Sequence, residues 1–309
     1  QPLGTNQTTS PLGTSQNLVI YPAPTLRLAG RALALDAVTS LNLQMAELVS
    51  GQECDGILGM NFLSQQAVLL DFDHGSLSWC DQVPDSVRQT FTPLPVTFTH
   101  GFYSIQVTVN HSHSLRLMVD TGDNSSLSLN SQDWQTVFGD HPSAVSTITV
   151  ADAANRISPT RMGVVDQLQV AGLVYTNLHA TFIRNAEDPS HVGLGFFKRH
   201  TVLLDLPDKV LYLRPGERFA QPDQEDRSGL HLLRQSGATL VYSVDQRSPA
   251  AAGGIQPGDQ IEDINGQPSN ELTLRTIRRL LRSPATAQVT LKIKHGENEF
   301  AVALQLHRS

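Results

Sequence analysis

The chain has 309 residues, of which 39% are hydrophobic and 17% charged, a composition typical of a globular protein with about two domains. Its net charge of -7 argues against nucleic-acid binding, and no apolar run approaches the roughly 18 residues that a membrane span requires. Residues 1–228 hold 13 Lys and Arg against 22 Asp and Glu, whereas residues 229–309 hold 9 against 7. Such a step in charge indicates a change of module.

Three segments of the region 1–80 recur in the same order further along the chain. LRLAG (from Leu26) recurs as LQVAG (from Leu168), DGILGMNF (from Asp55) as HVGLGFF (from His191), and VLLDFDHGSLSW (from Val68) as VLLDLPDKVLYL (from Val202). The offsets in the numbering are therefore 142, 136 and 134. Each segment has the aliphatic composition of a short strand closed by a Gly, Asp or Pro turn. The pattern predicts a duplicated, mostly β lobe, with a short helical turn after Leu-Gly-Met in the first copy and Gly-Leu-Gly in the second.

Two stretches separate these modules. QVPDSVRQTFTPLP lies between the two copies, and RPGERFAQPDQEDRSG has the composition of a flexible linker. The expected division is a first lobe at 1–80, a bridge at 81–95, a second lobe at 96–213, a linker at 214–228 and a separate module at 229–309.

The second lobe contains LRLMVDTGDNSSLSL, in which an apolar strand ends at Asp120. Thr121 can hydrogen-bond across a two-fold axis, and Gly122 permits a tight turn with the backbone close to the carboxylate. Further along the lobe, HVGLGFF supplies an apolar strand that can cross behind this loop in a ψ-shaped arrangement. ITVADAANRIS, between them, has the length of a hairpin that could fold over a substrate. Its tip is Ala151, Asp152, Ala153, Ala154 and Asn155.

Residues 1–213 resemble the retropepsin-like aspartic peptidases of the pepsin clan, in their duplicated single-chain form. The resemblance rests on MVDTG, DQLQVAG, GLGFF and VLLDL in the second lobe and on DGILGMNFL and VLLDFDHGSL in the first. It implies a mostly β fold of two acid-protease β-barrel lobes, in which two facing aspartates share one proton and activate a water. It also implies that Asp120, Thr121 and Gly122 form one half of the catalytic site, and that no metal or other cofactor takes part.

The partner aspartate is not evident in the first lobe. Subtracting the offset of 142 from the position of Asp120 gives a number below 1, so the equivalent residue of the first lobe would lie before Gln1, outside the sequence. Because the sequence starts without Met or a signal peptide, the missing strand is expected to have been removed with the N-terminus, or retained as a bound fragment. A homodimer in which a second chain supplies the aspartate, and a site that never had one, stay open. The position of each Asp in the first lobe makes it unsuitable: Asp36, Asp55, Asp71 and Asp73.

Asp123 follows Asp-Thr-Gly at a position where the family commonly has Ala or Ser. A carboxylate pointing inward would add like charge beside the catalytic pair, raise its apparent pKa and move activity toward neutral pH. A carboxylate turned into solvent would have no such effect, and the sequence leaves both orientations open.

Residues 229–309 resemble a PDZ domain, an α+β module, of the kind attached to bacterial envelope proteases. The resemblance rests on GLHL, on SPAAAGGIQPGDQIEDINGQP and on a helix predicted over 271–282 that buries one apolar face. It implies that the GLHL loop presents backbone N–H groups to a terminal carboxylate while the peptide pairs with the strand edge. The loop is Gly229, Leu230, His231 and Leu232. The helix arginines, at 275, 278, 279 and 282, are expected to form an ordinary solvated face, with a preference for acidic ligands as the alternative.

The leading hypothesis is an aspartic endopeptidase that cleaves extended polypeptides, with a PDZ domain that binds the C-termini of substrates or partner proteins. The competing hypothesis is a catalytically inactive peptide-binding or regulatory protein, which the single Asp-Thr-Gly favours. The domain pair suggests the bacterial periplasm or another extracytoplasmic location, with the cytoplasm as the alternative. Cys54 and Cys80 could form a disulfide or remain thiols. His111 and His113 lack a third ligand at useful spacing, so no metal site is expected.

Overall fold

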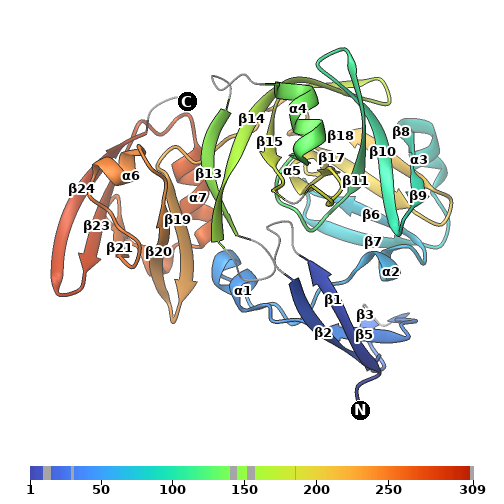
Figure 1. The fold of residues 1–309 in the computed structure, drawn as a ribbon, viewed down its shortest axis with the longest axis horizontal. Coiled ribbons are helices and arrows are strands. Elements are labelled where there is room, and N and C mark those ends of the chain that lie inside the picture. The colour runs from blue at the N-terminus through green and yellow to red at the C-terminus, as the bar shows by residue number, and fades with distance from the viewer. Residues whose placement is uncertain (10–14, 29–30, 140–144, 152–156, 185, 307–309) are drawn as a thin grey trace. The chain divides into compact units, whose positions relative to one another are not determined.

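The computed structural model describes residues 1–9, 15–28, 31–139, 145–151, 157–184 and 186–306 (Figure 1). The chain divides into two compact units. The first consists of Gln1–Leu41, Leu58–Ser146 and Thr160–Asp223, and the second of Asn42–Ile57, Thr147–Pro159 and Gln224–Ser309. Most of the regular structure is β-strand, which confirms the predicted fold class.

One sheet supplies most of the strands of the first unit, in the order β14-β15-β12-β16-β11-β10-β9, and β13 pairs with β14. A further pairing of β14 with β10 closes the sheet into a barrel. Every second residue of β10 and β11 points into this barrel, and Val107 and Leu117 are among its fully buried side chains. The strands are β9 (Thr97–Thr99), β10 (Phe102–Val109), β11 (His113–Val119), β12 (Leu127–Leu129), β13 (Val145–Ala151), β14 (Ile157–Val170), β15 (Leu173–Phe182) and β16 (His191–Val192).

A second sheet joins the two copies of the repeat, in the order β7-β6-β17-β18-β8. Its central strands, β6 and β17, pair antiparallel with Leu69 opposite Leu203. These two leucines occupy the same place in the repeated Val-Leu-Leu-Asp, so the pairing of β6 with β17 is symmetric about a local two-fold axis, as equivalent strands of a repeat would be. The strands are β6 (Ala67–Asp71), β7 (Ser76–Cys80), β8 (Thr92–Pro95), β17 (His200–Asp205) and β18 (Val210–Pro215).

The two copies also share the short helix that the sequence predicts. Helix α2 (Met60–Leu63) follows Gly59, and helix α5 (Leu194–Phe197) follows Gly193. In both, the carbonyl of that glycine accepts hydrogen bonds from the N–H groups three and four residues on. Gly59 therefore corresponds to Gly193, which is an offset of 134 in the numbering, and the offset of 136 expected for this segment is wrong.

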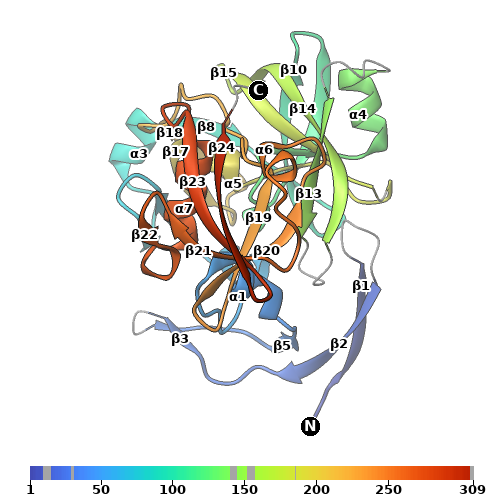
Figure 2. The same ribbon diagram turned by 90° about the vertical axis from the view of Figure 1, so that its left-hand side faces the viewer.

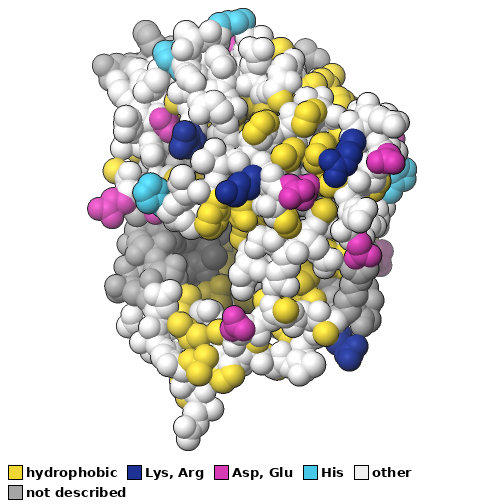
Figure 3. Space-filling model, turned by 90° about the vertical axis from the view of Figure 1, so that its right-hand side faces the viewer, with side chains coloured by type: hydrophobic (Ala, Val, Ile, Leu, Met, Phe, Trp, Pro, Cys, Tyr) yellow, Lys and Arg dark blue, Asp and Glu magenta, His cyan; other side chains and the backbone are white. Residues whose placement is uncertain are grey.

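The start of the first unit contains a three-stranded sheet and a short two-stranded hairpin. β1 (Gly4–Thr9) and β2 (Ser15–Pro22) pair antiparallel, β5 (Ala37–Ser40) extends the sheet beside β2, and β3 (Arg27–Leu28) pairs with β4 (Arg31–Ala32). The predicted bridge is itself structured, because it holds α3 (Asp85–Thr90) and β8. Figure 3 shows one face of the molecule, on which hydrophobic side chains are interspersed with charged and polar ones.

The sheet of the second unit has the order β19-β20-β21-β23-β24, and β22 pairs with β21. In Figure 2 the hairpin of β23 and β24 runs in front. Among the described residues, no helix is long and apolar enough to cross a membrane. The elements are α1 (Gln44–Ser50), β19 (Leu230–Gln235), β20 (Ala238–Val244), α6 (Pro249–Ala252), β21 (Gln260–Ile264), β22 (Gln267–Pro268), η2 (Ser269–Glu271), α7 (Leu274–Arg282), β23 (Gln288–His295) and β24 (Asn298–Gln305).

Helix α7 buries Leu274, Ile277 and Leu281, the three apolar residues that its period predicts. It begins later than the expected start at Glu271, because the Thr273 hydroxyl accepts a hydrogen bond from the Thr276 N–H, a capping contact that fixes the first turn. Helix α1, which belongs to the first copy of the repeat, contacts β19 and α7 within this unit.

The polar run predicted as a flexible linker is hydrogen-bonded at both ends. In the first unit, the buried Arg199 guanidinium donates to Asp223 Oδ1 at 2.7 Å and to the backbone carbonyl of Gln221. In the second, Arg227 donates to the carbonyls of Ser283 at 2.6 Å and of Thr286 at 3.0 Å. These contacts satisfy polar groups at each end of the run within its own unit, and the flexibility of the run stays a prediction.

Candidate active site

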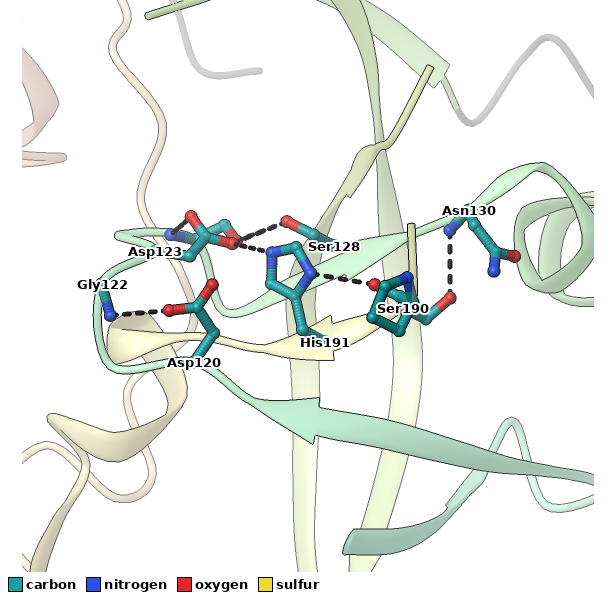
Figure 4. A network of polar contacts seen from close by, with 9 residues as sticks. Asp120, Gly122, Asp123, Ser128, Asn130, Ser190 and His191 are labelled. Carbon is teal, nitrogen blue, oxygen red and sulfur yellow. Dashed lines mark hydrogen bonds and ion pairs between the residues drawn. The ribbon is translucent and has the colours of Figure 1, made fainter. Parts of the chain in front are cut away.

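The loop of Asp120 lies at a strand crossing. β11 carries Asp120 at its end, and β16 lies between β11 and β12, parallel to the first and antiparallel to the second. The Asp120 N–H donates to the Val192 carbonyl at 3.0 Å, which fixes the start of the loop to β16. This is the ψ-shaped arrangement that the sequence predicts. Figure 4 shows the loop and the polar groups around it.

The side chain of Asp120 is partly exposed at the tip of this crossing. Its Oδ1 accepts a hydrogen bond from the Gly122 N–H at 2.8 Å, so the turn after the aspartate orients the carboxylate. Among the described residues, Oδ2 has no hydrogen-bond partner, which leaves one oxygen available for a water or a second carboxyl group. Thr121 is also partly exposed.

The loop approaches the glycines of HVGLGFF very closely. Leu194 N–H donates to the Asp123 carbonyl at 2.6 Å, and Gly195 N–H donates to the Ser125 carbonyl at 2.9 Å. A Cβ atom on Gly193 would lie 2.3 Å from the Ser125 carbonyl oxygen and 2.8 Å from that of Asp123. Only glycine fits here, since both contacts are with backbone atoms that cannot rotate away.

Asp123 points inward, which resolves the two orientations that the sequence leaves open. Its carboxylate accepts hydrogen bonds from the Ser125 N–H at 2.9 Å, from the Ser128 hydroxyl at 2.7 Å and from the Ser125 hydroxyl. The ring of His191, on β16, contacts the same carboxylate at 2.9 Å between Nε2 and Oδ2. An inward Asp123 is expected from the sequence to add like charge beside Asp120. His191 pairs with Asp123 and compensates this charge, so that expectation does not hold.

Both partners of this pair have shifted pKa values. Burial alone would raise the pKa of Asp123, but the hydrogen bond and charge of His191, with the contacts of Ser125, hold it well below its usual range. Burial alone would lower the pKa of His191, but the hydrogen bond and charge of Asp123 raise it above 6.5. The pair is thus charged at mildly acidic pH, with only 7% of the histidine side chain and 24% of the aspartate exposed.

Sequence reasoning missed His191, which it treated as part of an apolar strand. The available signal was a histidine in the crossing strand, together with a carboxylate directly after Asp-Thr-Gly. The predicted hairpin tip is not placed: Asp152, Ala153, Ala154 and Asn155 lie outside the described residues, and Ala151 ends β13.

The predicted carboxylate loop of the second unit leads into β19. Gly229 has φ +75, and its N–H donates to Asp226 Oδ1 at 2.9 Å. The Leu230 N–H donates to the Ser228 hydroxyl at 3.1 Å, and His231 Nε2 contacts Asp245 Oδ1 at 2.9 Å. The N–H groups of Gly229 and Leu230 therefore already have acceptors in the two side chains before the loop, Asp226 and Ser228, and the His231 ring is held by Asp245.

One of the four helix arginines does not belong to a solvated face. Arg278 is partly buried and donates to the carbonyl of Leu232 on β19 at 2.7 Å, so it bridges α7 and β19. Burial lowers the pKa of its guanidinium. The expectation is correct for the other three arginines, at positions 275, 279 and 282, which are exposed.

Cys54 and Cys80 are free thiols in this structure. Burial raises the pKa of the Cys80 thiol, which disfavours the reactive thiolate. Within the described part of the chain, no group of three or more His, Cys, Asp or Glu residues is arranged to hold a metal ion.

Comparison with known families agrees with this geometry. The family described as aspartyl protease matches residues 105–196, and the PDZ domain family matches residues 240–295. The chain therefore contains a retropepsin-like aspartyl protease domain followed by a PDZ domain. No curated protein matches the chain.

Among solved structures, a retropepsin-like aspartic protease from Rickettsia conorii is 21% identical, with coverage of 40% of this chain and 94% of that one and a TM-score of 0.33. Basic 7S globulin from soybean is 12% identical, with coverage of 68% and 71% and a TM-score of 0.34. The serine endoprotease from Yersinia pestis is 9% identical, with coverage of 72% and 98% and a TM-score of 0.29. The assignment rests on the two families, since all three TM-scores are below 0.5.

Proposed function

We propose that the chain is an aspartic endopeptidase in which Asp120 is one of two catalytic carboxyl groups. The observation that carries the proposal is the Asp-Thr-Gly loop at the strand crossing. There the Gly122 N–H orients one carboxylate oxygen of Asp120, and the other has no partner among the described residues.

The chemistry requires a second carboxyl group facing Asp120. Two carboxyl groups that share one proton divide the work: the ionised group takes a proton from a water, and the protonated group polarises the scissile carbonyl. The sequence contains one Asp-Thr-Gly, so another strand must supply the second aspartate. A second copy of this chain, or a segment that pairs with the first copy of the repeat, would place it across the local two-fold axis marked by Leu69 and Leu203.

A second candidate function is peptide binding without cleavage, which the single Asp-Thr-Gly favours. The inhibitor profile separates the two functions. An aspartic endopeptidase cleaves β-casein, is blocked by a statine-containing peptide, and is unaffected by a sulfonyl fluoride or a chelator. Cleavage that the sulfonyl fluoride abolishes would contradict the assignment, and statine-peptide binding without cleavage would favour the binding protein.

We further propose that the PDZ domain binds polypeptide C-termini along β19. The N–H and C=O of one residue in an extended strand point to the same side. The Leu232 carbonyl that Arg278 reaches therefore marks the strand edge available to a peptide. An incoming peptide displaces Arg278 from this carbonyl, and the freed guanidinium then lies close enough to pair with the peptide's terminal carboxylate.

Arg278→Gln is accordingly expected to weaken binding of peptides with a free C-terminal carboxylate roughly tenfold, about 1.4 kcal/mol, and to leave amidated peptides unaffected. The measurement is fluorescence anisotropy of a C-terminal hexapeptide library, free or amidated, on the full chain. Arg282→Gln, an exposed arginine one turn further along α7, is the matched control and should change affinity less than twofold. Unchanged affinity and carboxylate preference in Arg278→Gln would contradict the role of Arg278.

A further inference from the structure

We propose that His191 is a positioning residue of the peptidase site: as an imidazolium paired with Asp123, it holds the loop that presents Asp120. This inference rests on the proposed peptidase function and adds a residue to it. His191 lies on β16, the strand that crosses behind the loop, and only 5% of the residue is exposed. Figure 4 shows its ring between Asp123 and the backbone that precedes β16.

The hydrogen-bond geometry itself indicates a doubly protonated ring. Nε2 faces the Asp123 carboxylate at 2.9 Å, and Nδ1 faces the Pro189 carbonyl oxygen at 3.2 Å. Both partners are acceptors, so both ring nitrogens must donate, and only the imidazolium has two N–H groups. A neutral ring would place a nitrogen lone pair against one of these oxygens.

The His191–Asp123 pair fixes the segment of the loop that directly follows Asp120. Neighbouring residues of β16 hold the two aspartates: the Val192 carbonyl accepts from the Asp120 N–H, and the His191 ring contacts the Asp123 side chain. Asp123 also accepts hydrogen bonds from Ser125 and Ser128, so its contact with His191 restrains these two residues as well. The loop is thus attached to one rigid strand at both aspartates, and this fixes the direction of the Asp120 carboxylate.

Two carboxylates of the loop attract the protonated ring. Asp123 makes the direct contact, and the Asp120 carboxylate also attracts the imidazolium. The Pro189 carbonyl before β16 faces Nδ1 of the ring, and the Ser128 hydroxyl on β12 donates to the Asp123 carboxylate. Deprotonation of His191 would therefore leave two carboxylates without their shared counter-charge.

The pair has a defined pH window. The lowered pKa of Asp123 gives stability that is present above pH 3.8 and is lost as the pH falls through its folded-state value. The raised pKa of His191 gives stability that is present below pH 6.5 and is lost as the pH rises through its folded-state value. The full stability contribution of the pair is therefore present between pH 3.8 and 6.5, and the positioning fails on the alkaline side, above pH 6.5, when the folded-state His191 loses its proton.

The test compares the titration of His191, measured by NMR of its imidazole nitrogens, with the pH profile of casein cleavage. In the wild-type chain, both nitrogens of His191 should be protonated at pH 6, and the alkaline limb of kcat should follow its pKa. In Asp123→Asn the pKa of His191 should fall, and the alkaline limb should move to lower pH by the same amount. If Asp123→Asn does not fold, Asp123→Ser is used, because a small hydroxyl can still bond to Ser125 and Ser128.

His191→Gln should lower kcat by about 10–100-fold while KM stays within about threefold, since a misaligned carboxylate slows the chemistry and leaves substrate contacts in place. His111→Asn is the matched control, because His111 is exposed at a left-handed turn position that asparagine tolerates. A neutral His191 at pH 6, or an alkaline limb that stays in place while the pKa of His191 falls, would overturn the inference and leave the peptidase function standing. Absence of cleavage by the wild-type chain would contradict both the peptidase function and the positioning role of His191.

Discussion

Replacing Gly193 by alanine is expected to destabilise the lobe that contains Asp120 severely. The new Cβ would lie 2.3 Å from the Ser125 carbonyl oxygen and 2.8 Å from that of Asp123. Neither oxygen can move freely, because each accepts a hydrogen bond from the backbone of the same turn, Asp123 from Leu194 and Ser125 from Gly195. Opening the crossing would break these bonds and separate β16 from the Asp120 loop.

We expect the cost to exceed about 4 kcal/mol, a large part of the roughly 5–15 kcal/mol that stabilises a typical domain. Urea unfolding followed by tryptophan fluorescence measures it, since Trp134 is buried in the same lobe. Gly56→Ala is the control, because a Cβ on Gly56 would meet no atom within 4 Å. A Gly193→Ala chain that unfolds at the same urea concentration as the wild type would contradict the close packing of the crossing.

Asp120→Asn is expected to reduce kcat for casein cleavage by about 10³-fold or more, because an amide can neither take a proton from water nor share one with a second carboxyl group. The fold should survive, since the amide oxygen of asparagine can still accept from the Gly122 N–H. The measurement is the initial rate of appearance of new N-termini at the pH optimum. The melting temperature of the same samples then separates a chemical defect from a folding defect.

Asp166→Asn removes an exposed carboxylate from β14 of the same lobe and serves as the control, with a rate expected within twofold of the wild type. If Asp120→Asn retained the wild-type rate, the hydrolysis would come from another group and the assignment of Asp120 would fail.

Features with a strong periodic or repeated pattern could be predicted from the sequence. The repeated Val-Leu-Leu-Asp predicted equivalent strands, and the two strands pair with Leu69 opposite Leu203. The buried face of α7 followed from the spacing of its three apolar residues. In the strand crossing, the aliphatic run before Asp120 and the glycines after His191 pointed to the two strands that do pair.

Features that depend on tertiary contacts could not be predicted in this way. The pairing of Asp123 with His191 joins residues that are distant in sequence, and nothing in the local pattern connects the two. Arg278 has the same helical environment in sequence as Arg282, and only the position of β19 distinguishes them. Composition does not reveal that Asp223, in the polar run after residue 213, binds Arg199.

The register of the repeat shows the same limit. Sequence similarity aligned two Leu-Gly pairs and gave an offset of 136 in the numbering, whereas the hydrogen bonds of α2 and α5 give 134. The structural role of the glycine that opens each helix decides the alignment, because Gly193 contacts the loop backbone and Gly59 occupies the same place in the first copy.

The measurement that tests the central claim most directly is cleavage of β-casein by the purified wild-type chain between pH 3 and 8, over a range of protein concentrations, with Asp120→Asn alongside. New peptide termini, identified by mass spectrometry, should appear with the wild-type chain and be lost with the variant. Intact casein at every pH and concentration from a folded sample, or equal cleavage by the two proteins, would contradict the account.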